Sequence, residues 1–254
     1  MQEYFEYLNK FYDKIYVLSV ASFEHRRKLF AERFSGLNYT FFFGADKNKF
    51  SIEELIEKGI FSEELTRKHH RYGKTMKPGE IACAWSHKMI YEEMLEKGFQ
   101  QILIFEDDAI PVAEMMNKIP ETLTEVPADC ELLMWGWDKN GESNIKAFIK
   151  QAGYHILYQI GFLNWNHTII KNISAKSYSP QLKKAGFHDY TYSYAINKSG
   201  AKKLLNMQTP VQYIADNLLA HACTQQIVNG YIVYPAAFLH DSHPDGTSRD
   251  SYIR

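Results

Sequence analysis

Three consecutive acidic residues, Glu106, Asp107 and Asp108, follow the apolar run Gln101–Phe105. The run is too uniformly apolar for an exposed edge, so it predicts a buried strand with the three carboxylates at its carboxyl end. Ligands bind at the carboxyl ends of strands in open α/β sheets. Carboxylates at that place are hard oxygen ligands for Mg²⁺ or Mn²⁺ on a phosphate-bearing substrate. A solvated turn or a helix cap is the alternative interpretation.

A second polar cluster, residues 240–245, follows the last expected strand and its short extension. Imidazole suits Mn²⁺ as well as Zn²⁺, and a histidine added to carboxylates favours a transition metal over Mg²⁺. His240 and His243 are therefore candidate metal ligands, and a polar loop is the alternative. A zinc hydrolase would need further His or Cys at ligand spacing, which the sequence does not contain.

The neighbours Ser86 and His87 do not form a nucleophile and base pair. Adjacent residues on a helix do not face each other, and the chain has no Gly-x-Ser-x-Gly elbow. We expect these two residues to pack in the interior or to support the residues that react. The basic stretch 69–71, beside Lys74 and Lys77, is expected to be a solvated face, with phosphate contact as the alternative.

The elements that must position these residues alternate between strands and helices, as in a mainly parallel α/β sheet. Ser51 is expected to cap one helix, and Gly98 to end another. Strands are expected at 14–20, 39–43, 101–105, 131–135, 156–160, 191–196 and 231–234, helices at 24–33, 51–70, 78–97, 198–206 and 211–222, and loops at 138–143 and 164–180. No linker divides the chain, which predicts a single domain over residues 1–254.

Composition and charge exclude several classes of protein. The chain has 254 residues, 45% hydrophobic and 15% aromatic, which excludes disorder and low-complexity character. A net charge of −1 supplies no field for nucleic-acid binding. The charge is uneven: residues 1–170 carry 20 basic and 25 acidic side chains, whereas 171–254 carry 9 and 5. An anionic ligand near the C-terminal part fits this asymmetry.

Cysteines and targeting signals indicate the compartment. Cys83, Cys130 and Cys223 are odd in number and widely spaced, so neither a disulfide framework nor a cysteine zinc site is expected. A reducing cytoplasm fits this pattern. The chain also lacks a signal-peptide pattern and an apolar run of membrane-spanning length. We expect a soluble cytoplasmic protein, or at most one peripheral to the inner face of a membrane.

Five segments in the same order resemble one known family. They are Lys14–Arg27, Gly79–His87, Ile102–Ala109, Tyr194–Leu205 and the stretch from Pro210 to Asp216. Together they look like the ordered signature of glycosyltransferase family 25, which contains bacterial lipooligosaccharide galactosyltransferases and collagen galactosyltransferases.

The resemblance implies a GT-A fold, in which an α/β nucleotide-binding sheet holds a divalent cation, Mn²⁺ or Mg²⁺, against a nucleotide-sugar diphosphate. It implies a UDP-sugar donor, most often UDP-galactose, and inverting transfer to a glycan such as lipooligosaccharide or lipopolysaccharide. The donor part then covers about 14–135, and the acceptor side about 150–254. Donor contacts are expected at Leu18, Ser19, Arg26, Glu106 and Asp107, and metal ligands at Glu106, Asp108, His240 and His243.

The acceptor hydroxyl needs a base opposite the leaving group, and inverting transferases usually use a carboxylate. Asp216 is the expected base because it follows the Tyr194–Leu205 segment, as the base does in other inverting GT-A galactosyltransferases. Asp189, beside His188, is the alternative. Two other functions remain open: a metal-dependent phosphoesterase or nucleotidyltransferase, and a non-catalytic carbohydrate-binding module whose aromatic residues stack on sugars.

Overall fold

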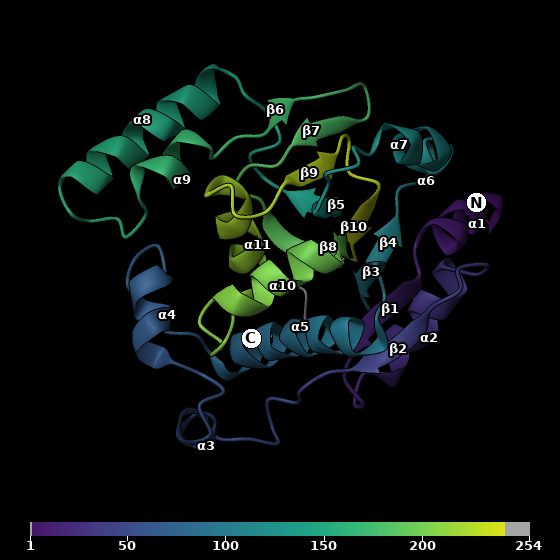
Figure 1. Ribbon diagram of the computed structural model, residues 1–254, viewed down its shortest axis with the longest axis horizontal. Coiled ribbons are helices and arrows are strands. Elements are labelled where there is room, and N and C mark those ends of the chain that lie inside the picture. The colour runs from purple at the N-terminus through teal and green to yellow at the C-terminus, as the bar shows by residue number, and fades with distance from the viewer. Residues whose placement is uncertain (1, 242–254) are drawn as a thin grey trace.

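The computed structural model describes residues 2–241 and contains a large central sheet between two layers of helices (Figure 1). The strands in this part of the chain are β1 (Lys14–Ser19), β2 (Thr40–Phe43), β3 (Gln101–Glu106), β4 (Ala109–Pro111), β5 (Leu132–Asp138), β6 (Lys176–Ser177), β7 (Leu182–Lys184), β8 (Asp189–Asn197), β9 (Gly230–Val233) and β10 (Phe238–His240). The helices are α1 (Gln2–Phe11), α2 (Glu24–Arg33), α3 (Ile52–Glu57), α4 (Glu63–His69), α5 (Pro78–Lys97), α6 (Ala113–Met116), α7 (Ile119–Glu125), α8 (Ile145–Gln159), α9 (His167–Lys171), α10 (Lys198–Met207) and α11 (Ala215–Thr224).

The central sheet has eight strands in the order β2-β1-β3-β8-β5-β9-β7-β6. Strand β1 is parallel to β2 and β3, and β5 is parallel to β9, whereas β8 runs antiparallel between β3 and β5. The expected α/β class, a sheet flanked by helices, is confirmed, and the sheet is mixed because β8 is inserted in the opposite direction. Strand β4 begins directly after the acidic residues and forms a separate antiparallel pair with β10.

Side chains alternate between the two faces of each strand, and both faces are buried, which explains why the strands are continuous apolar runs in the sequence. On β3, Leu103 and Phe105 pack with α1 and α2, while Ile102 and Ile104 pack with α5, α10 and α11. Successive side chains of a strand point to opposite faces. Since both faces are covered by helices, both sets are buried, and the strand ends at its first charged residue, Glu106.

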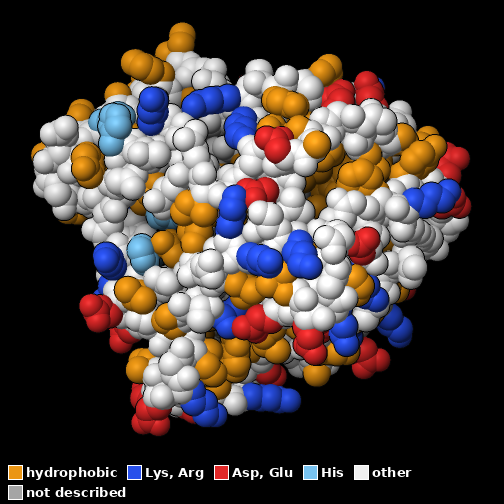
Figure 2. Space-filling model, in the orientation of Figure 1, with side chains coloured by type: hydrophobic (Ala, Val, Ile, Leu, Met, Phe, Trp, Pro, Cys, Tyr) orange, Lys and Arg blue, Asp and Glu red, His pale blue; other side chains and the backbone are white. Residues whose placement is uncertain are grey.

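The expected strand at 156–160 is wrong, because these residues form the end of helix α8. The apolar residues of this segment recur at helical spacing over a longer stretch that begins at Ile145. No residue of α8 is buried. Figure 2 shows hydrophobic side chains at the surface, beside Lys and Arg, in the region where α8 lies in Figure 1.

Other expected boundaries change in smaller ways. The helix expected at 51–70 is two helices, because the chain turns at Gly59 with a φ of +67°, and Ser51 caps the first as expected. The loop expected at 164–180 contains α9 and β6 and buries Trp165. The helix expected from Val211 begins at Ala215, since Val211 pairs with Phe61 in a β-bridge. Among the described residues, no helix combines the length and hydrophobicity needed to cross a membrane.

We predict that Tyr12→Phe destabilises the fold. Trp135 is fully buried, and its Nε1 donates a hydrogen bond to the Tyr12 hydroxyl at 2.8 Å. Loss of that acceptor leaves a buried N–H unsatisfied, so the free energy of unfolding in urea should fall by about 1–3 kcal/mol. Tyr7→Phe, at a tyrosine exposed on α1, is the control and should change it by less than about 0.5 kcal/mol. Equal effects of the two changes would contradict the prediction.

Candidate functional site

The three acidic residues lie at the carboxyl end of β3, as expected, and a cation from α2 neutralises two of them. The Arg26 guanidinium Nη2 lies 2.6 Å from Asp107 Oδ1 and also pairs with Asp108 Oδ2. Asp107 additionally accepts a hydrogen bond from Ser19 Oγ at 2.6 Å. Asp107 is therefore held toward the sheet, whereas Asp108 is more exposed.

Burial has the largest effect on the pKa values of Asp107 and Asp108. It raises the pKa of Asp107 to about 6, because the charge of Arg26 and the Ser19 hydroxyl offset only part of the cost of removing the carboxylate from water. Burial also raises the pKa of Asp108, and the charge of Arg26 opposes this shift. Asp108 Oδ1 is buried and accepts no hydrogen bond from the described residues. A buried carboxylate oxygen without a hydrogen-bond partner is a suitable ligand atom for a cation.

Glu106 faces away from Arg26, toward α5 and β8. Its Oε1 accepts a hydrogen bond from the Thr191 hydroxyl and lies 3.9 Å from His87 Nε2. His87 Nδ1 lies 2.8 Å from the Tyr194 hydroxyl, which is 2.6 Å from the Tyr91 hydroxyl. Burial alone would raise the pKa of Glu106, but the His87 imidazole and the Thr191 hydroxyl lower it by more. His87 is thus a buried residue that positions Glu106.

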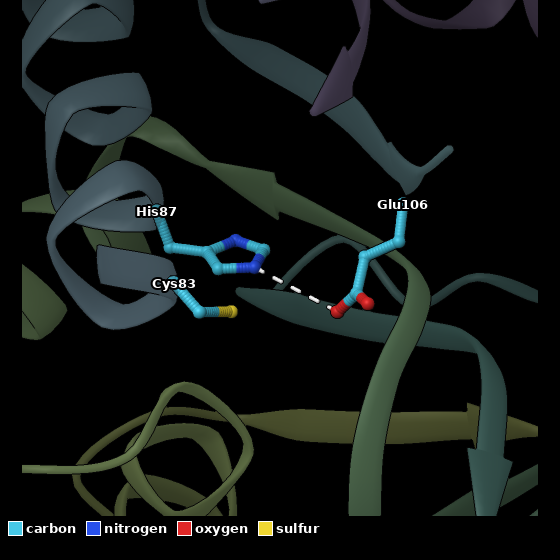
Figure 3. A group of neighbouring side chains, drawn as sticks. All are labelled: Cys83, His87 and Glu106. Carbon is cyan, nitrogen blue, oxygen red and sulfur yellow. Dashed lines mark ion pairs between the residues drawn. The ribbon is translucent and has the colours of Figure 1, made fainter. Parts of the chain in front are cut away.

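A second possible metal set surrounds Glu106 (Figure 3). Cys83 and His87 lie one turn apart on α5 and point toward Glu106, and one ligand atom from each residue lies within 4.8 Å of the others. In the described part of the chain no other group of three potential ligands is this compact. Thiolate and imidazole favour Zn²⁺. However, burial and the neighbouring carboxylates raise the pKa of the Cys83 thiol well above its ordinary value, which keeps it neutral.

The structure brings one of the two predicted histidines to the acidic motif. His240 pairs with Ala109 across β10 and β4, and the next amide, that of Asp241, donates to Asp108 O at 2.8 Å. The charge of His240 lowers the pKa of Asp108, as expected for a neighbour. Its ring also lies 4.8 Å from that of Tyr192. His243 lies outside the described residues.

The predicted donor contacts lie where three parallel strands end together. Leu18 and Ser19 end β1 beside the end of β3. On the other side of β1, Phe43 ends β2 with its ring exposed, and the Arg27 guanidinium lies 5.2 Å from the centre of that ring. This edge presents a serine, carboxylates, guanidinium groups and an exposed ring side by side.

A cleft of about 290 Å³ lies between the turn that follows α4, the start of β8 and the start of α11. The Asp216 carboxylate lies in it at the start of α11 and accepts hydrogen bonds from the amides of Tyr190 at 3.0 Å and Asn217 at 2.7 Å. Burial raises the pKa of Asp216 to about 6, and the charges of Asp189 and Glu106 raise it further against those amides. The two carboxylate groups, that of Glu106 and that of Asp216, therefore share one electrostatic environment.

Asp189, the alternative base, lines the same cleft but is already paired. Its Oδ2 lies 2.5 Å from the Lys139 ammonium. No cation within the described residues is paired with Asp216. A carboxylate without a cation partner accepts a proton more readily than one in an ion pair.

Two further cleft residues were missed by the sequence analysis. Tyr190 has a φ of +69°, which is unusual for a non-glycine residue, and this conformation directs its amide to Asp216 while its ring stacks on Tyr192 at 5.0 Å. Arg71 belongs to the stretch expected to be solvated, but it lines the cleft and packs 3.9 Å from the Trp165 ring centre. The alternating tyrosines at 190, 192 and 194 could have identified Tyr190 from the sequence, whereas no local pattern identifies Arg71.

Comparisons with known proteins point to one family. The model of glycosyltransferase family 25 (LPS biosynthesis protein) matches residues 12–219. The inactive glycosyltransferase 25 family member 3 of Homo sapiens is 26% identical over 136 residues, which is 54% of this chain and 19% of that protein. A glycosyltransferase 25 family member of Anopheles gambiae is 27% identical over 197 residues, or 76% of this chain and 28% of that protein. The chain therefore spans less than a third of either relative.

One solved structure is also similar. It is the galactosyltransferase LgtC in complex with donor and acceptor sugar analogues, with a TM-score of 0.35 and 10% identity, covering 91% of this chain and 87% of that one.

We predict that Asp216→Asn changes how stability depends on pH. The ordinary pKa of an aspartate is 3.8, and the pKa of Asp216 in the fold is about 6. The contribution of Asp216 to the stability of the wild type is therefore fully present below pH 4 and is lost as the pH rises through 6. The amide cannot ionise. Relative to the wild type, the variant should therefore gain about 2–3 kcal/mol of unfolding free energy between pH 4 and pH 7, as measured in urea.

Asp129→Asn, at an exposed aspartate, is the control and should follow the wild-type pH profile. If Asp216→Asn follows the wild-type profile too, the raised pKa of Asp216 is contradicted.

Proposed function

Because the chain belongs to glycosyltransferase family 25, we propose that it transfers a hexose from a UDP-sugar to a glycan acceptor with inversion. As the resemblance implies, the donor is UDP-galactose and the acceptor is the glycan of a lipooligosaccharide or lipopolysaccharide. The donor part covers about residues 14–135, and the acceptor side about 150–254. The three unpaired cysteines support a cytoplasmic location for the reaction.

One observation carries the proposal: a carboxylate that has no cation partner among the described residues lines a cleft and lies within electrostatic range of the acidic strand end. Asp216 lies in the cleft, and Glu106 is close enough to influence its pKa. A donor diphosphate at the strand ends and an acceptor in the cleft would then meet between these residues. Metal chemistry on one side and proton transfer on the other are what a sugar transfer needs.

On the donor side, Ser19, Arg26 and Asp107 are the proposed donor contacts at the strand ends. Asp108 and His240, with Glu106, would hold Mn²⁺ or Mg²⁺, since the buried Asp108 Oδ1 has no partner among the described residues and the charges of Glu106 and His240 both act on Asp108. A bound divalent cation would neutralise the charge that develops on the departing UDP.

On the acceptor side, Asp216 takes the proton of the attacking hydroxyl. The acceptor oxygen forms a bond to the anomeric carbon as the bond from that carbon to the diphosphate breaks, and UDP leaves with the electron pair. A pKa near 6 suits this step, because the base is ionised near neutral pH and is still basic enough to receive the proton. Tyr190 holds the Asp216 carboxylate and offers its exposed ring to the acceptor sugar.

The decisive experiment incubates the protein and Mn²⁺ with a panel of nucleotide sugars, and measures UDP release with and without truncated lipooligosaccharide. We expect release that requires both the acceptor and UDP-galactose. Phosphate release from simple esters without an acceptor would indicate a phosphoesterase or nucleotidyltransferase. Glycan binding without UDP release would indicate a carbohydrate-binding protein.

Asp216→Asn should abolish transfer and preserve UDP binding. General bases contribute about 10²–10⁴-fold, so kcat should fall by at least that factor. Calorimetric titration with UDP should give an unchanged Kd, because the carboxylate acts on the acceptor. Asp189→Asn is the matched comparison. If it produces the collapse of kcat and Asp216→Asn does not, Asp189 is the base.

The two possible metal sets are separated by Asp108→Asn and Cys83→Ala. We expect Asp108→Asn to weaken Mn²⁺ binding, measured by calorimetry with UDP present, by at least about tenfold, because it removes a charged oxygen ligand. Cys83→Ala should leave Mn²⁺ binding unchanged. The reverse result would assign the metal to Cys83, His87 and Glu106, and unchanged melting temperatures would exclude a loss of folding.

A further inference from the structure

Helix α8 carries a row of apolar side chains that face solvent. They recur at helical spacing along one side and continue past the end of the helix. Each is 64–79% exposed, and together we call them the α8 stripe: Ile145, Phe148, Ile149, Ile156, Ile160 and Phe162. Exposed apolar side chains that occur singly need no explanation, but a continuous row on one helix face marks an interaction surface.

The opposite side of α8 accounts for its attachment to the protein. Tyr154 and Leu157 pack against the buried cluster around Trp165, and Gln151 donates to the carbonyl of Ile170 at 2.8 Å. The helix is therefore held by its mixed polar and aromatic side. This leaves its most apolar side outward, the reverse of the usual orientation of a surface helix.

The charge of this region indicates what the α8 stripe contacts. Residues 143–188 contain six lysines and no aspartate or glutamate. Lys146 of α8 and Lys171 of the adjacent α9 are both exposed. A second copy of the chain would bring two such positive surfaces together, which is unfavourable. An apolar helix face flanked by lysines is instead the pattern of helices that lie in the interface of an anionic bilayer.

We propose that the α8 stripe docks the protein on the surface of a membrane that contains anionic phospholipid. The apolar side chains enter the interface, and the lysines contact phosphate groups while their stems lie along the apolar surface. Tyr154 of α8 accepts a hydrogen bond from Arg71 Nη1 at 3.3 Å, and Arg71 lines the cleft. Docking thus places the cleft beside the bilayer. The proposal does not depend on the proposed function.

The test is cosedimentation of the full chain with vesicles of phosphatidylcholine alone, and of phosphatidylcholine mixed with phosphatidylglycerol. The wild type should bind the mixed vesicles at low salt and much less at high salt. The triple variant Phe148→Ser, Ile149→Ser and Ile156→Ser should reduce the partition coefficient at least about tenfold, because binding strength scales with buried apolar area. Lys146→Glu with Lys171→Glu should weaken binding to the mixed vesicles.

The control is Tyr7→Ser with Ile56→Ser, which removes two exposed apolar side chains on α1 and α3. It should bind as the wild type does, and circular dichroism should show that all variants are folded. No binding by the wild type, equal binding by the triple variant, or equal binding to both kinds of vesicle would overturn the proposal. A wild-type dimer that the triple variant loses, seen by ultracentrifugation, would assign the α8 stripe to a second copy instead. None of these measurements involves sugar transfer.

Discussion

Arg26 reaches from α2 to the carboxylates of both Asp107 and Asp108, and the arrangement of the site depends on this contact. Three adjacent acids at the end of a buried strand repel one another, and burial makes each of them costly to ionise. The guanidinium offsets part of that cost for Asp107 and Asp108. The charge of Arg26 also acts on Glu106 at longer range, but the Glu106 carboxylate contacts Thr191 and His87. One cation thereby divides a run of three acids between two environments.

Glu106 is linked through buried side chains to other elements of the fold. The buried chain from Glu106 through His87 and Tyr194 to Tyr91 connects β3, α5 and β8 by polar contacts within an otherwise apolar layer. Polar contacts inside an apolar layer restrict the arrangement of side chains, although His87 Nε2 lies 3.9 Å from Glu106 and has no hydrogen-bond partner among the described residues. Strand β8, which carries Tyr194, also begins at Asp189 and carries the Tyr190 amide that binds Asp216. The antiparallel strand thus joins the acidic motif to the cleft.

The acidic motif and the cleft are built from different parts of the chain. The ends of β1 and β3 provide hydroxyl and carboxylate groups and α2 provides guanidinium groups, whereas the cleft is formed after α4 and around the start of α11. The relatives include a human protein named inactive. Membership of the family alone therefore does not establish sugar transfer, and Asp216 and the cleft become the features to test.

The sequence by itself determined the local elements and the acidic motif. Apolar runs, Ser51 and Gly98 identify strands and helix ends, because their physical causes lie within a few residues. A longer window of sequence, from Ile145 onward, decides that residues 156–159 are helix and not strand. Tertiary structure decided the rest. The pairing of Arg26 with Asp107, the lack of a described cation partner for Asp216 and the place of Arg71 in the cleft depend on segments distant in the chain. Charge pairing and desolvation act through space, so no local pattern encodes them.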